Sequence, residues 1–188
     1  MSKAAKKPRG WKAVWQQLAA WDKPALLALV KALYEAAGVN RDLIDARCHP
    51  EEEFSGRTLE KYRGKIVEQF FPARGFGKLR LNEARKAIRD YRKATGNLPG
   101  TAELLMTYVE NGTRFTREYG DIDERFYASM ESALEELAAL LRGKARDLYP
   151  QVRERLAQVG QMADGIGWGY GDFVTDLVDR LEEELGDP

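Results

Sequence analysis

Residues 124–141 read ERFYASMESALEELAALL, and this stretch decides the fold class. Its large apolar side chains recur at spacings of three and four residues, so they fall on one face of an α-helix. Three glutamates, Glu124, Glu131 and Glu135, lie on the opposite face. Such a wide apolar stripe stabilises a helix in water only when it is covered, so the segment predicts a packed helix. The apolar face consists of Phe126, Tyr127, Met130, Leu134, Leu137 and Leu141.

The same spacing recurs along the rest of the chain, and no segment alternates with the period of two that a strand requires. We therefore expect an all-α fold, a compact bundle of eight or nine short helices. The pairing of helices resembles a helical-repeat protein, although no repeat of fixed length is visible. The other helical segments are expected at residues 11–21, 22–38, 40–49, 59–71, 82–95, 101–112 and 150–163 and after Asp172.

The first ten residues differ from the rest of the chain. MSKAAKKPRG is polar and basic and contains Pro8 and Gly10, which predicts a disordered basic tail over residues 1–10. The remaining residues, 11–188, are enough for one sizeable hydrophobic core. We expect them to form a single all-helical domain.

Composition excludes several classes of function. The 30 basic and 30 acidic side chains cancel, so no overall field attracts nucleic acid or an anionic membrane. Cys48 is the only cysteine, and His49 beside it is the only histidine, so the chain cannot supply a zinc site. No apolar run is long enough to span a bilayer. We expect a cytoplasmic protein with no metal, no cofactor and no membrane partner.

The charge is nevertheless segregated along the chain. Residues 57–93 carry twelve basic and four acidic side chains, whereas residues 101–141 carry three basic and nine acidic ones. The cations of residues 74–93 are a candidate nucleic-acid interface, with Phe76 stacking on a base. Alternatively, this face docks the chain's own acidic segments or is simply solvated. The cations are Arg74, Lys78 and Arg80 and, on one helical stripe, Arg85, Lys86, Arg89, Arg92 and Lys93.

Three charged residues are candidates for structural pairing or for a pocket. Asp121 and Asp123 lie in EYGDIDE, but the residues that follow do not fit a calcium loop, so we interpret Asp121 or Asp123 as a helix cap. Arg63 falls on the apolar face of its helix, where a buried guanidinium needs a carboxylate. We expect Arg63 to pair with Asp121 or Asp123.

The stretch DGIGWGYGD, residues 164–172, has a glycine at every second position. It lacks the preceding strand and the lysine of a phosphate-binding loop, and its neighbours are acidic. We interpret it as a structural turn in which Trp168 fills a gap in the core and Asp172 caps the last helix. A ligand pocket that uses Trp168 is the alternative.

Four segments together carry a resemblance to an uncharacterised bacterial domain family that is catalogued only under a number. The resemblance implies a small helical domain, and it implies no activity, because none is attached to that family. It assigns no catalytic residue. The segments are KYRGKIVEQFFP (61–72), LNEARKAIRDY (81–91), YVENGTRFTREYGDIDERFYASMESAL (108–134) and DGIGWGYGDF (164–173).

No spacing in the chain identifies a catalytic set, so we expect no enzymatic activity. The leading hypothesis is a helical protein-interaction module that recognises another protein or a second copy of itself. The alternative is a nucleic-acid-binding protein that uses residues 74–93. An enzyme ranks third, and a bound metal or a deep pocket lined by Asp121, Asp123 and Trp168 would favour it.

Overall fold

The computed structural model describes residues 10–49 and 52–186, and all regular structure within them is helical, which confirms the predicted all-α bundle. The predicted tail lies outside these residues except for Gly10. The elements are α1 (Trp11–Leu18), α2 (Lys23–Ala36), α3 (Gly38–Cys48), α4 (Glu52–Phe70), α5 (Leu81–Thr95), α6 (Leu98–Tyr119), α7 (Glu124–Arg142), a 3₁₀ turn η1 (Arg146–Leu148), α8 (Tyr149–Ala163) and α9 (Tyr170–Leu185).

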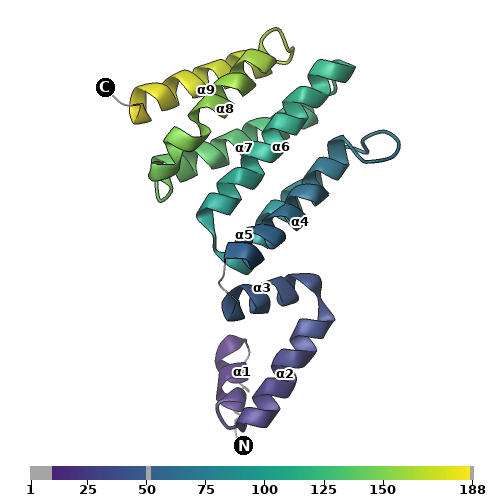
Figure 1. The fold of residues 1–188 in the computed structure, drawn as a ribbon, viewed down its shortest axis with the longest axis vertical. Helices are drawn as coiled ribbons and strands as arrows, with labels where there is room; N and C mark the ends of the chain where they lie inside the picture. The colour runs from purple at the N-terminus through teal and green to yellow at the C-terminus, as the bar shows by residue number, and fades with distance from the viewer. Residues whose placement is uncertain (1–9, 50–51, 187–188) are drawn as a thin grey trace, which may run out of the picture.

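Helices α4–α9 form a body with one hydrophobic core (Figure 1). Helix α6 lies at its centre and packs against α4, α5, α7 and α8. It begins where the side chain of Asn97 accepts a hydrogen bond from the backbone N–H of Gly100 at 2.8 Å. Every apolar residue of the stripe from Phe126 to Leu141 is buried in this core. The stripe that decides the fold class is therefore covered by neighbouring helices.

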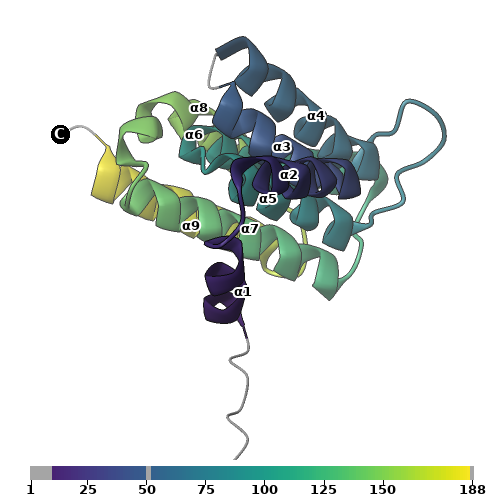
Figure 2. The same cartoon turned by 90° about the horizontal axis from the view of Figure 1, so that it is seen from below.

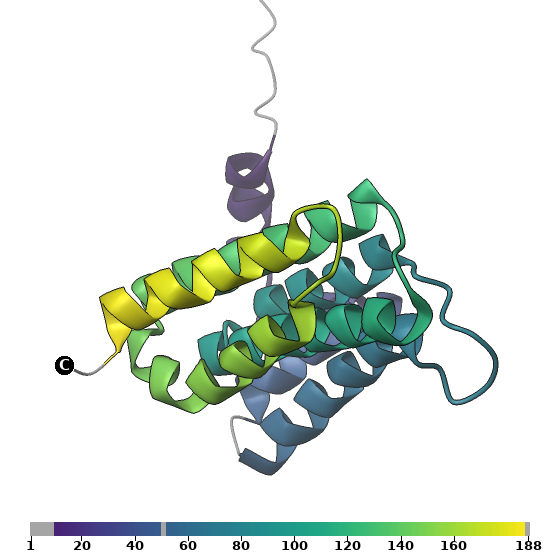
Figure 3. The ribbon, with the colours of Figure 1, turned by 90° about the horizontal axis from the view of Figure 1, so that it is seen from above.

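Helices α1 and α2 form a separate feature, which we call the arm and define as residues 10–36. Neither helix has a buried residue, and among the residues whose side chains the structure describes, the core begins at Tyr62. Figure 1 shows the arm at one end of the long axis, away from α8 and α9. In Figures 2 and 3, α1 projects beyond the body. The arm therefore adds length to the molecule and adds nothing to the core.

Helix α3 joins the arm to the body by packing against α5 and, less extensively, α4. Its buried residue Asp42 accepts hydrogen bonds from Lys61 Nζ at 2.7 Å and from Tyr62 Oη at 2.7 Å. Burial, together with the bond to Asp42, raises the pKa of Tyr62, so this phenol stays protonated as a donor. A buried, charge-assisted network thus fixes the base of the arm.

The glycine-rich turn lets α9 return closely along α8. Gly165 and Gly169 have φ values of 73° and 70°, a conformation that costs glycine little. A Cβ atom on Gly171 would lie 2.7 Å from the carbonyl oxygen of Ala163, so the two backbones approach too closely for a side chain. Helix α9 begins at Tyr170 after Gly169, and Asp172 lies in its first turn. The prediction that Asp172 caps this helix is therefore wrong.

Candidate functional site

All four tryptophans of the chain are exposed to solvent. Trp11, Trp15, Trp21 and Trp168 have exposed fractions of 71%, 59%, 45% and 61%. The core is built instead from tyrosine, phenylalanine and aliphatic side chains. Tryptophan buries a large apolar area and is enriched at protein interfaces, so its placement on the surface is the strongest functional signal in the molecule.

Three of these tryptophans belong to the arm, together with four exposed aliphatic residues. On α1, Trp11, Val14 and Trp15 follow the spacing of one helical face, which we call the α1 stripe. On α2, three aliphatic residues spaced three apart form the α2 stripe, and all of them are exposed. The two stripes are therefore uncovered apolar surfaces on neighbouring helices. The α2 stripe consists of Leu27, Val30 and Leu33.

The predicted basic stripe is partly neutralised by the chain itself. Arg85 and Arg92 of α5 both donate hydrogen bonds to Glu136 of α7, at 2.9 and 3.2 Å. Arg85 also lies over the ring of Tyr108, 5.7 Å from its centroid. Lys86 pairs with Asp90 one turn along the same helix. Part of this face thus docks an acidic segment, as the alternative interpretation expects. The exposed remainder consists of Arg74, Lys78, Arg80, Arg89 and Lys93.

Phe76 belongs to an aromatic cluster of the body. Its ring meets those of Phe115 and Tyr119 at centroid distances of 5.3 and 4.8 Å, both edge-on. Phe71 packs on Phe115 and Tyr119 from the same side. These contacts hold the loop before α5 against α6, although much of the Phe76 ring remains exposed. The ring is therefore already used in packing.

Arg63 pairs with a different carboxylate from the predicted ones. Its guanidinium donates to Glu103 Oε1 on α6 at 3.0 Å and lies 3.2 Å from Glu60 on its own helix. Arg155 of α8 joins the same cluster by donating to Glu103 and Glu110. The prediction that Arg63 pairs with Asp121 or Asp123 is wrong, because the middle of α4 faces the first half of α6. The ion cluster ties α4, α6 and α8 together.

Asp121 and Asp123 are occupied by contacts within their own loop. Tyr127 Oη donates to Asp121 Oδ1 at 2.8 Å, and the backbone N–H of Phe126 donates to Asp123 Oδ1 at 2.8 Å. Asp123 is the N-cap of α7, as predicted. The glycine-rich turn lies beside this loop, because a Cβ atom on Gly167 would be 2.8 Å from Asp121. Two loops that the sequence singles out separately are therefore neighbours.

Trp168 does not fill the core, contrary to the structural interpretation of its loop. It adopts a left-handed conformation, with φ of 61°, and its side chain lies on the surface. Left-handed backbone costs a non-glycine residue about 1–2 kcal/mol. The flanking glycines set the course of the turn, so Trp168 follows it outward.

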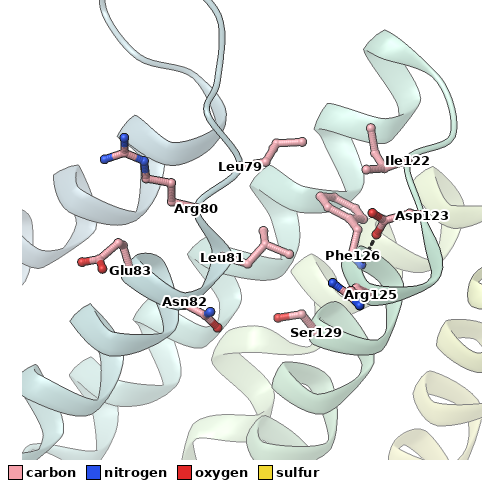
Figure 4. A pocket seen from close by; sticks show the side chains of 10 residues that line it. All are labelled: Leu79, Arg80, Leu81, Asn82, Glu83, Ile122, Asp123, Arg125, Phe126 and Ser129. Atoms are coloured by element: carbon pink, nitrogen blue, oxygen red, sulfur yellow. Dashed lines mark hydrogen bonds between the residues drawn. The ribbon is translucent and has the colours of Figure 1, made fainter.

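A cavity of about 560 Å³ lies between the loop before α5 and the start of α7 (Figure 4). Asp123 is on its wall, where its carboxylate caps α7. Ser129 lines the cavity too, and its hydroxyl lies 2.7 Å from that of Tyr108. Burial raises the pKa of Tyr108 to about 12, so this phenol is no base for the serine at neutral pH. Asp121 and Trp168, the other predicted pocket residues, do not line this cavity.

Within residues 10–49 and 52–186, no group of three histidine, cysteine, aspartate or glutamate side chains is placed to hold a metal ion. None of the described helices is both long enough and apolar enough to cross a bilayer.

No known protein family, curated protein or solved structure matches the chain. The resemblance to an uncharacterised bacterial family accordingly stays a prediction. Sequence reasoning missed the arm as a site, because an apolar stripe has the same spacing whether the core or a partner covers it. The clustering of Trp11, Trp15 and Trp21 within eleven residues is the signal that was available.

Proposed function

We propose that this protein is a non-enzymatic protein-interaction module whose docking surface is the apolar face of the arm. The observation that carries the proposal is that Trp11 and Trp15 on α1 and Trp21 in the connection to α2 are exposed, and that neither helix buries a residue. The contiguous hydrophobic core lies elsewhere in the chain, and the arm contributes no buried residue to it. Amphipathic helices of this kind bind by laying their apolar stripe against another apolar surface.

The charge of the arm favours a protein over a polyanion as the partner. Residues 10–36 carry three basic and two acidic side chains: Lys12, Lys23, Lys31, Asp22 and Glu35. Nucleic-acid affinity rests on several cations that neutralise phosphates, and the arm offers a near-neutral surface instead. The partner that fits is therefore a polypeptide that presents an apolar helical face.

Photo-crosslinking in the native cell tests this function. Benzoylphenylalanine in place of Leu33 sits on the α2 stripe, and in place of Ala32 it sits about 100° further round the same helix. The proposal expects crosslinks to defined polypeptide segments from the first position and few from the second. Adding Trp15→Glu should abolish those crosslinks. Crosslinks to nucleic acid or lipid, or equal yields at both positions, would overturn the proposal.

Nucleic-acid binding is the second candidate, because Arg74, Lys78, Arg80, Arg89 and Lys93 have no ion pair in the described part of the chain. Retarded mobility of RNA or DNA at low salt, lost in the Arg89→Glu/Lys93→Glu variant, would support it. Unchanged mobility at low salt would exclude it. Both variant positions are exposed, so the substitutions remove no buried side chain.

A further inference from the structure

The arm presents two apolar stripes that the chain leaves apart. If the α1 stripe packed on the α2 stripe of the same chain, both would be buried, yet all six of their residues are exposed. Figure 2 shows the reason, since α1 turns away from α2 after a short connection over residues 19–22. Each stripe is therefore left uncovered, although the two stripes are apolar faces of the same kind.

The exposed apolar area of the arm matches what a stable dimer requires. Three tryptophans exposed by 71%, 59% and 45%, with the four exposed aliphatic residues, present roughly 600 Å² of apolar surface. An interface of standard size removes about 800 Å² from each partner, and about 57% of that area is apolar. The arm alone therefore supplies the apolar part of such an interface.

A second copy of the chain, related by a two-fold axis, would cover both stripes. When α1 of each copy lies on α2 of the other, every contact occurs twice about a two-fold axis, and all four stripes are covered. Two near-neutral arms do not repel each other, because three basic and two acidic side chains are spread over residues 10–36. The result is a four-helix arrangement of the type that short amphipathic helices commonly form.

We infer that two copies of this chain associate through their arms, with the α1 stripe of each copy packed on the α2 stripe of the other. The inference rests on the proposed function, since it names a second copy as the arm's partner. The bodies lie outside this contact, so they remain free on either side of it. Exposed tryptophans of the single chain become buried in the dimer.

Sedimentation velocity of the purified full chain tests the inference. We compare the wild type with Trp15→Glu/Val30→Glu, which places a charge on each stripe, and with Gln16→Glu/Ala32→Glu, which adds the same charges away from the stripes. All four positions are exposed or partly exposed, so folding is unaffected. Wild type and control should sediment as dimers at micromolar concentration. The stripe variant should dissociate at least about a hundredfold more readily, and its tryptophan emission should shift to the red.

Thiol crosslinking then tests which helices meet. In a Cys48→Ser background, chains that carry Val14→Cys are mixed with differently tagged chains that carry Leu33→Cys. If α1 of each copy packs on α2 of the other, disulfides between the two kinds of chain should exceed those between chains of one kind. A preference for pairs of the same kind would overturn the exchanged arrangement.

The failure of this inference differs from the failure of the proposed function. A wild type that stays monomeric overturns the inference, but arm-dependent crosslinks from position 33 to a different polypeptide still support the function. A monomer that floats with anionic phospholipid vesicles through its arm overturns both, and so does a monomer without arm-dependent crosslinks. A dimer that persists in the stripe variant also overturns the inference.

Discussion

The arm and the body both consist of helices with an apolar stripe, but the stripe of α7 in the body is buried and the stripes of the arm are exposed. In α7 every apolar residue of the stripe is buried, whereas α1 and α2 bury none of theirs. Helical spacing therefore shows that a face will be covered without showing what covers it. The type of aromatic residue separates the two regions better, since three of the four tryptophans lie in the arm, whereas the buried aromatic residues of the core are tyrosines and phenylalanines.

Alkaline solution should unfold the body completely. Burial raises the pKa values of five tyrosines in it, to about 12 for Tyr108 and Tyr149. Below the ordinary pKa of about 10 both states keep the proton, so the contribution is constant. Above it the unfolded chain releases protons that the folded chain holds, so stability falls as pH rises. The five are Tyr62, Tyr108, Tyr127, Tyr149 and Tyr170.

Circular dichroism and tyrosinate absorbance, followed together, measure this effect. Helicity should hold to about pH 10 and then fall in one transition in which tyrosinate appears. Phenols that all titrate near pH 10 while the helices persist would contradict the burial of these side chains.

Truncating one leucine in each region should show that the body and the arm contribute unequally to the free energy of unfolding. Leu104 of α6 is fully buried, so Leu104→Ala should lower the free energy of unfolding by about 3 kcal/mol, through lost burial and the cavity left behind. Leu27→Ala on the exposed α2 stripe should change it by less than about 0.5 kcal/mol in the monomer. Urea unfolding of both variants in dilute solution provides the comparison. Equal losses would mean that the arm shares the core.

The fold class was predictable because most helices carry a local signal, but the central helix α6 was only partly located: it was expected at residues 101–112 and runs from Leu98 to Tyr119. Periodicity located α5 and α7 closely, and Asp123 was identified as a cap from its position before an apolar run. The start of α4 was harder to predict, because EEEFSGR reads as a loop, but α4 begins at Glu52. The first and last residues of a helix depend on small energy differences, whereas the existence of the helix does not.

The site was less predictable because it depends on which faces meet in space. Arg63 was identified as a residue that needs a carboxylate, but its partner Glu103 lies 40 positions away in a helix whose orientation the sequence does not specify. Trp168 was assigned to the core because large aromatic residues usually lie there, and the left-handed turn carries it outward instead. Pairing across helices is a tertiary property that spacing along one helix does not encode.

Two glycines of the body, Gly171 and Gly160, differ in the space around them. Gly171→Ala should destabilise the body by about 2 kcal/mol, because the new methyl group would overlap the carbonyl oxygen of Ala163 and the backbone has to move. Gly160 of α8 has open space where its Cβ would be, so Gly160→Ala should stabilise the helix by about 0.5–1 kcal/mol. Thermal unfolding of the two variants checks both signs. A neutral Gly171→Ala would show that α8 and α9 are not closely apposed.

The smallest effect concerns the joint between arm and body. Asp42→Asn keeps one carbonyl oxygen as an acceptor but removes the charge that Lys61 and Tyr62 bind, so the anchor should weaken by about 1 kcal/mol. Amides of α3 should then exchange hydrogen several times faster, while those of α6 and α7 remain unchanged. Asp45→Asn is the matched control, because its contact is a longer bond from Tyr34 at 3.3 Å within the arm and α3. Faster exchange throughout the body would mean that the arm and the body unfold as one unit, and the distinction between them would then be one of exposure alone.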